Sequence, residues 1–144
     1  MFVVDTNVLV YAADADAPEH EPCRSLLEGS RRGRTPWYLT WGIVYEFLRV
    51  VTHRRVLRSP LATNEALSFV EAVLASPSVH ILTETPRHLE VLAEVMEEVV
   101  LLAGNLYHDA HTVALMREHG ISSIFTRDTD FHRFHFLEVR DPLQ

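Results

Sequence analysis

The apolar positions of the sequence fall into short runs that alternate with longer helical patterns. The first run, Phe2-Val3-Val4, is apolar at three consecutive positions, and a helix-compatible pattern follows it. Consecutive apolar and β-branched residues are typical of a strand that is buried on both faces, as in a parallel sheet. The chain therefore opens with a predicted buried strand, and Asp5 stands where that strand ends.

Four further runs predict strands, and helical patterns separate most of them. The predicted strands cover residues 35–39, 79–82, 122–126 and 136–139, the last of them at a sheet edge. The predicted helices cover residues 18–30, 41–52, 64–75, 86–102 and 106–119. Helix caps are expected at Thr40, at Thr63 or Asn64, and at Thr85 before Pro86. This alternation predicts an α/β fold with a mostly parallel central sheet that is flanked by helices on both faces.

Asp5 and Glu46 are acidic residues at the borders of apolar segments. Burial of the Asp5 carboxylate costs free energy unless a proton, a hydrogen-bond donor or a cation compensates it. A simple helix cap is the alternative role of Asp5. Glu46 lies at the edge of the apolar stripe of the helix 41–52, where its alternative role is an ion pair with Arg49.

Three more acids occur in the last third of the chain. Asp109 shares a predicted helical face with Val113 and Met116, so its side chain is expected to point along the apolar side. Asp128 and Asp130 lie just past the end of the predicted strand 122–126. In parallel sheets the ligand crevice lies at the carboxyl ends of the strands. We therefore expect these acids to converge with Asp5, with Glu46 at the same rim.

A group of carboxylates at one place favours a bound divalent cation. Two unit charges about 4 Å apart repel by roughly 4 kcal/mol at an effective dielectric constant of about 20. Oxygen ligands favour Mg²⁺ or Mn²⁺ over zinc. The spacing of His108 and His111 does not match a zinc-binding helix pair, and His20, His53, His80 and His88 are scattered. The acidic run 128–130 lacks the glycine and the distant glutamate of a calcium-binding hand.

Charge composition narrows the possible functions. The formal net charge is −7, and all 13 basic residues are arginine. This balance argues against unselective nucleic-acid binding, although arginines cluster in residues 31–34 and 49–58. The absence of lysine argues against P-loop phosphoryl transfer. It also argues against haloacid-dehalogenase-like phosphatases and response-regulator receivers, which resemble this N-terminal stretch but normally use a lysine.

Length and hydropathy predict a single domain that spans residues 1–144. The 144 residues are 47% hydrophobic, which is enough for a full core. Cys23 is the only cysteine, so the chain forms no internal disulfide. The sequence has no signal-peptide pattern and no apolar stretch of membrane-spanning length. We therefore expect a cytoplasmic protein that does not contact a membrane.

The order of the motifs resembles a known family. The chain contains four motifs in a fixed order. They are the stretch FVVDTNVLVY, a mid-chain Glu on a helix, His-Asp-Ala-His at a late helix start, and Thr-Arg-Asp-Thr-Asp-Phe near the end. Together they are similar to the PIN-domain ribonucleases, specifically the VapC toxins of type II toxin–antitoxin pairs. The resemblance implies a PIN-like three-layer fold. It also implies that Asp5, Glu46, Asp109 and Asp128 bind one or two Mg²⁺ or Mn²⁺ ions, with Thr6, Asn7, Thr126 and Asp130 in support.

The resemblance further implies endonucleolytic cleavage of RNA, often tRNA or ribosomal RNA, by a homodimer that a cognate antitoxin silences. Two other functions stay open. One is a catalytically silent PIN-like binding module, whose acidic pocket docks an arginine of a partner. The other is a metal phosphatase for small substrates on the same sheet architecture, which fold alone does not exclude.

Overall fold

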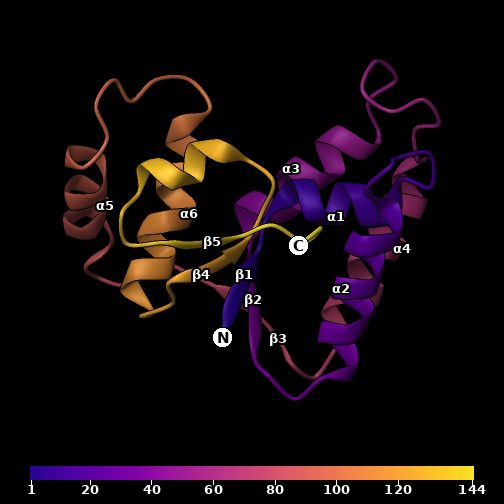
Figure 1. Cartoon of the computed structure of the whole chain (residues 1–144), viewed down its shortest axis with the longest axis horizontal. Coiled ribbons are helices and arrows are strands. Elements are labelled where there is room, and N and C mark those ends of the chain that lie inside the picture. Colours follow the sequence, from indigo (N-terminus) through magenta and orange to yellow (C-terminus); the bar gives the residue numbers. More distant parts are fainter.

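The computed structural model describes residues 1–144, and its centre is a five-stranded sheet in the order β3-β2-β1-β4-β5 (Figure 1). The strands are β1 (Phe2–Val4), β2 (Trp37–Thr40), β3 (Val79–Leu82), β4 (Ser123–Phe125) and β5 (Glu138–Arg140). Every neighbouring pair of strands is parallel. Val3 and Val4 are fully buried in the central strand. The prediction of a mostly parallel sheet that starts with a buried strand is confirmed.

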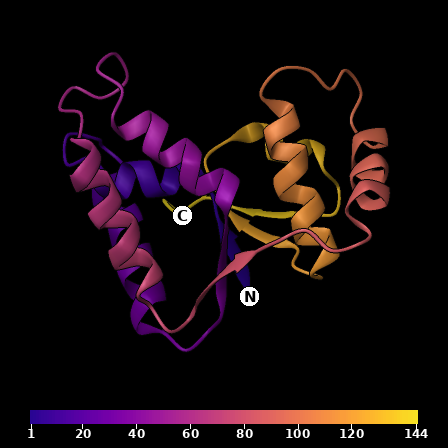
Figure 2. The same cartoon turned by 180° about the vertical axis from the view of Figure 1, so that it is seen from behind.

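Helices cover both faces of the sheet. They are α1 (Thr6–Ala13), α2 (His20–Arg32), α3 (Trp41–Val51), α4 (Thr63–Leu74), α5 (His88–Glu97) and α6 (Leu106–Glu118). Helices α1 to α4 gather on one side of the sheet, and α5 and α6 pack together on the other (Figures 1 and 2). This is the three-layer arrangement expected of a PIN-like fold. None of the helices combines the length and the apolar character that crossing a membrane requires.

The strand order reverses beside β1, and this reversal determines which chain segments meet. From β1 the chain steps outward through β2 to β3, then returns past β1 to β4 and ends at β5. A right-handed crossover places its helix on one face for the first direction and on the other face for the second. The carboxyl ends of β1 and β4 are therefore neighbours between two oppositely placed helical layers, which is where ligands bind in open parallel sheets.

Helix α3 is fixed at its start by the predicted cap. The Thr40 side chain is fully buried, and its Oγ1 accepts a hydrogen bond from the backbone N–H of Ile43 at 3.0 Å. The inward face of α3 consists of buried apolar side chains, which are Ile43, Val44, Phe47 and Val51. Glu46 lies beside this face and is half-buried. The cap and the apolar face together fix where the Glu46 carboxylate points.

Two predicted helix starts differ from the structure. The helix predicted over residues 86–102 begins at His88. The Thr85 hydroxyl accepts the backbone N–H of Arg87 at 3.2 Å, as a cap does, but it also donates to Glu118 on α6, and Pro86 and Arg87 form a turn before the helix. The helix ends at Glu97, and the backbone at Leu101 has a positive φ of 61°, which a right-handed helix does not allow. The cap of α4 is Ala62, whose backbone N–H donates to Glu65, so the predicted caps at Thr63 or Asn64 are wrong.

The C-terminal segment also differs in detail from the prediction. The last strand lies at the sheet edge as expected, but it covers Glu138–Arg140 and not residues 136–139. A short 3₁₀ helix, η1 (Thr129–Arg133), follows β4 and was not predicted. The aromatic side chains of Phe131 and Phe134 are buried in and beside η1. Their burial fixes the direction in which the chain leaves the end of β4.

The Thr40 cap provides a test of how α3 is positioned. Replacement of Thr40 by alanine removes the acceptor of the Ile43 N–H, whereas serine keeps it. We expect Thr40→Ala to lower the free energy of unfolding by about 1 kcal/mol relative to Thr40→Ser, as for other N-caps. Urea denaturation of both variants measures the difference. Equal stability of the two variants would show that the hydroxyl does not hold the helix start.

Candidate metal centre

Asp5 is a buried carboxylate at the end of β1, with only 8% of its surface exposed. Its Oδ1 accepts a hydrogen bond from the backbone N–H of Thr6 at 2.7 Å, so Asp5 does cap α1. Its Oδ2 accepts hydrogen bonds from Asn7 Nδ2 at 2.7 Å and from Thr126 Oγ1 at 2.6 Å. Despite these donors, burial raises the pKa of Asp5 to about 6. The helix-cap role and a place in the acidic site therefore coexist.

Thr126 links the ends of β1 and β4. Its hydroxyl donates to Asp5 and accepts from Asn7 Nδ2 and from the backbone N–H of Asp128, both at 2.9 Å. One donated and two accepted bonds fully use a hydroxyl group. Asn7 Oδ1 also accepts from the backbone N–H of Arg127 at 3.2 Å. The predicted supporting residues Asn7 and Thr126 thus fix the backbone and the carboxylate on which the site is built.

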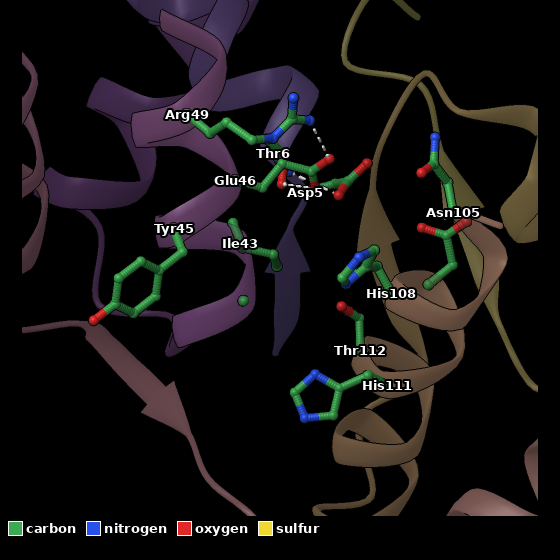
Figure 3. Close-up of a pocket in the computed structure, with 12 residues that line it drawn as sticks. Asp5, Thr6, Ile43, Tyr45, Glu46, Arg49, Asn105, His108, His111 and Thr112 are labelled. Atoms are coloured by element: carbon green, nitrogen blue, oxygen red, sulfur yellow. Dashed lines mark hydrogen bonds and ion pairs between the residues drawn. The ribbon is translucent and has the colours of Figure 1, made fainter. Parts of the chain in front are cut away.

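Glu46 reaches the same place from α3. The Thr6 hydroxyl donates a hydrogen bond to Glu46 Oε2 at 3.1 Å. Arg49 approaches the other oxygen, with Nη2 at 3.5 Å from Oε1, so the expected local ion pair is present as well. In Figure 3, Asp5 and Glu46 lie together and face Asn105 and His108 of the α6 region across the cavity.

Asp109 is the least compensated acid of the group. It lies in the first turn of α6, is half-buried, and accepts no hydrogen bond from another protein group. Burial raises the pKa of Asp109 to about 7, and the negative charges of Asp128, Asp5, Asp130 and Glu46 contribute further, in that order. Four other acids repel the charged form of this carboxylate, so a cation that binds beside it is strongly favoured.

Asp128 and Asp130 approach Asp109 from the segment after β4. Asp128 Oδ1 accepts the backbone N–H of Asp130 at 2.8 Å and so caps η1. Asp130 Oδ1 pairs with Arg133 Nε at 3.1 Å. One carboxylate oxygen from each of Asp109, Asp128 and Asp130 lies within 4.8 Å of the others. Asp130, expected only in support, is thus one of the three most tightly grouped carboxylates.

All five predicted acids line one open cavity of about 370 Å³. An adjoining cavity of about 540 Å³ shares Asp5, Glu46 and Asp109 with it. The two arginines that contact the acids, Arg49 and Arg133, do so at largely exposed positions where ion pairs are weak. The donor set consists of oxygen atoms with excess negative charge, which fits a hard divalent cation such as Mg²⁺ or Mn²⁺.

The two arginine clusters differ in their position relative to the acids. Arg31 and Arg32 line a separate cavity that contains none of the five acids. Arg49 lines the larger acidic cavity. The loop after α3 carries the exposed Arg54, Arg55 and Arg58, and its Val56 lines the smaller acidic cavity. Basic side chains are therefore available at the rim of the acidic site on the α3 side.

Three further lining residues were not predicted as site residues, and His108 was considered only for a zinc-binding pair that its spacing from His111 does not match. Asn105 and His108 line both cavities, and Tyr45, which is 71% exposed, lines the larger one. Asn105 precedes Asp109 by one helical turn, so its place on the same face was a usable signal. Tyr45 precedes Glu46 on α3. The hydrophobic periodicity of this helix places Tyr45 on the exposed face and gives no sign of a role in the site.

Comparison with known proteins identifies the family. The sequence matches the PIN domain over residues 2–137. Ribonuclease VapC48 of Mycobacterium tuberculosis is 38% identical over 138 residues, which are 96% of this chain and 94% of the relative. Ribonuclease VapC33 of the same organism is 34% identical over 144 residues, which are 100% of this chain and 99% of the relative.

Solved structures show the same fold at lower sequence identity. VapC20 of Mycobacterium tuberculosis, described as a toxin that cleaves the sarcin–ricin loop, has a TM-score of 0.67 at 21% identity, covering 97% of this chain and 99% of its own. FitAcB from Neisseria gonorrhoeae has a TM-score of 0.65 at 18% identity, covering 100% and 99%. With the PIN-domain match across nearly the whole sequence and full-length relatives above 30% identity, this chain belongs to the PIN-domain family of VapC ribonucleases.

Proposed function

We propose that this chain is a metal-dependent endoribonuclease and the toxin of a type II toxin–antitoxin pair, acting in the cytoplasm as one domain of residues 1–144. The observation that carries the proposal is the convergence of Asp5, Glu46, Asp109 and Asp128 on one cavity. RNA is itself an anion, so this cavity repels a phosphate unless a cation lies between them. The relatives named ribonuclease support RNA as the substrate.

Each acid has a role that follows from its surroundings. Asp5, Asp109 and Asp128 are proposed to hold the first Mg²⁺ or Mn²⁺ ion, with Asp130 close enough to share it. Glu46 is proposed to bind a second ion or to orient the attacking water, since it comes from α3 and lies outside the group of Asp109, Asp128 and Asp130. A divalent cation bound there supplies charge neutralisation and Lewis-acid activation of water and of the scissile phosphate.

The remaining residues position the RNA and the acids. Asn7 and Thr126 hold Asp5 in one orientation and keep the end of β1 against the end of β4. The exposed arginines of the loop after α3 are proposed to contact RNA phosphates, which makes binding sensitive to salt. Structured tRNA or ribosomal RNA is the proposed target, and VapC20, with the same fold, is described as cleaving the sarcin–ricin loop.

The proposed partners are a cognate antitoxin and a second copy of this chain. VapBC2 from Rickettsia felis, solved bound to a DNA fragment from its promoter, shares the fold with a TM-score of 0.67 at 15% identity. An acidic cavity with an exposed rim fits the proposal that a basic segment of an antitoxin fills it. Such an antitoxin would compete with both the cation and the RNA for the same carboxylates.

Loss of single acids tests the proposed nuclease. We expect Asp5→Asn and Asp109→Asn to lower Mn²⁺-dependent RNA cleavage by more than about 100-fold. Loss of a residue that only orients a metal ligand costs up to about 100-fold in metal affinity or activity, and loss of the ligand itself should cost at least as much. Asp16→Asn is the matched control, since Asp16 is exposed and lies outside both acidic cavities. Cleavage is measured on total RNA by mapping new ends.

Three outcomes of the cleavage experiment would overturn the proposal. Full activity of Asp5→Asn or Asp109→Asn would show that these carboxylates do not carry the reaction. Absence of any cleavage by the purified wild-type chain with Mn²⁺ would favour the silent binding module. Hydrolysis of small phosphate esters without RNA cleavage would favour the phosphatase.

The raised pKa values predict how stability depends on pH without metal. In the unfolded chain Asp109 loses its proton near pH 4, whereas burial holds its folded pKa at about 7. The folded state therefore binds more protons between these pH values, so the free energy of unfolding falls as pH rises through them. Asp5, with a pKa of about 6, adds to the same trend.

Denaturation in EDTA between about pH 4 and about pH 7 measures this trend, with Asp109→Asn as the comparison. We expect the wild type to lose stability relative to Asp109→Asn across this range, and saturating Mg²⁺ to remove the loss. Parallel curves for the two proteins in EDTA would contradict the raised pKa of Asp109.

A further inference from the structure

A second group of metal-ligating side chains lies outside the five acids. Glu84 follows β3, His88 begins α5, and His111 lies in the middle of α6. One ligand atom from each of the three lies within 4.8 Å of the others. The two imidazole rings meet edge to face, with centroids 5.4 Å apart and an interplanar angle of 85°. We propose that Glu84, His88 and His111 form a site for a transition cation of the Zn²⁺ type.

His88 is oriented as metal-binding histidines are. Its Nδ1 lies 2.7 Å from Oε2 of Glu118, whose side chain has no exposed surface. The other oxygen of Glu118 accepts the backbone N–H of Thr85 at 3.0 Å, so this carboxylate is itself fixed. A buried carboxylate behind one ring nitrogen sets the tautomer and leaves Nε2 free to bind a metal ion. No protein group contacts His88 Nε2 through a hydrogen bond.

Glu84 and His111 complete the group from the accessible side. His111 Nε2 lies 3.0 Å from Glu84 Oε1, and their side chains are 33% and 53% exposed. An ion can therefore enter from solvent without any rearrangement of the core. The other ring nitrogen of His111, Nδ1, lies beside Gly42 of α3. His88 Nε2 is unpaired, and His111 Nε2 and Glu84 Oε1, which now contact each other, would both turn to a bound ion.

The donor set distinguishes this site from the acidic cavity. Two imidazole nitrogens and one carboxylate oxygen are typical ligands of zinc, and three protein ligands leave one position open. The five acids offer oxygen alone, which suits Mg²⁺ or Mn²⁺. The two donor sets share no residue, but both use α6, where His111 stands two residues after Asp109 and lines the larger acidic cavity with it. A cation held by Glu84, His88 and His111 would clamp α5 and the end of β3 to the helix that carries Asp109.

Zinc titration of the full-length, tag-free chain tests the site in the presence of saturating Mg²⁺. Isothermal titration calorimetry is run on the wild type, Glu84→Gln, His111→Gln, Asp128→Asn and His135→Gln. His135 is exposed and makes no polar contact, so it controls for the loss of a surface imidazole. We expect one equivalent of Zn²⁺ to bind to the wild type, Asp128→Asn and His135→Gln. Glu84→Gln and His111→Gln should bind it at least about tenfold more weakly.

A spectroscopic measurement separates ligation from general surface binding. Nitrogen-15 spectra of the histidine rings should show Zn²⁺-dependent shifts at His88 and His111 and not at His135. Glu84 is exposed, so Glu84→Gln is expected to fold normally. If His111→Gln does not fold, the comparison of Glu84→Gln with the wild type still tests the site. The proposal is overturned if the wild type binds no Zn²⁺, if Glu84→Gln binds it unchanged, or if Asp128→Asn abolishes binding.

Discussion

The site depends on a single junction, where the end of β1 meets the end of β4. The strand order reverses beside β1, so no crossover helix separates these two ends. The Thr126 hydroxyl spans the junction and donates to Asp5 Oδ2 at 2.6 Å, joining residues 121 positions apart in the sequence. The backbone N–H of Asp128 donates to the same hydroxyl. Together with Asn7, which bonds to both Asp5 and Thr126, this side chain fixes how the acids of the two strands lie relative to one another.

The fold concentrates negative charge at this junction instead of dispersing it. Asp5 receives three hydrogen bonds and Asp109 none, yet burial raises the pKa of both carboxyl groups. The apolar packing of α3 and α6 against the sheet holds their acids at the cavity in spite of this repulsion. A divalent cation is the natural counter-charge for such a group, because the basic side chains that pair with the acids, Arg49 and Arg133, do so at exposed positions where ion pairs are weak.

The sequence predicted those parts of the structure that depend on local pattern and on sheet rules. The strand Val79–Leu82 has the predicted bounds, and the convergence of Asp5 with Asp128 follows from parallel strand order. The start of α5 was predicted two residues early, and the bond of the Thr85 hydroxyl to Glu118, a partner 33 positions away, is a contact that no local pattern reveals. The grouping of His88 with His111 was missed for the same reason, since their contact arises from the packing of α5 on α6.

The most direct test of the central claim is anomalous diffraction from crystals of this chain grown with Mn²⁺. The account predicts a strong manganese peak that carboxylate oxygens of Asp5, Asp109 and Asp128 coordinate. Manganese found only elsewhere on the chain, or no ordered manganese at a saturating concentration, would contradict it.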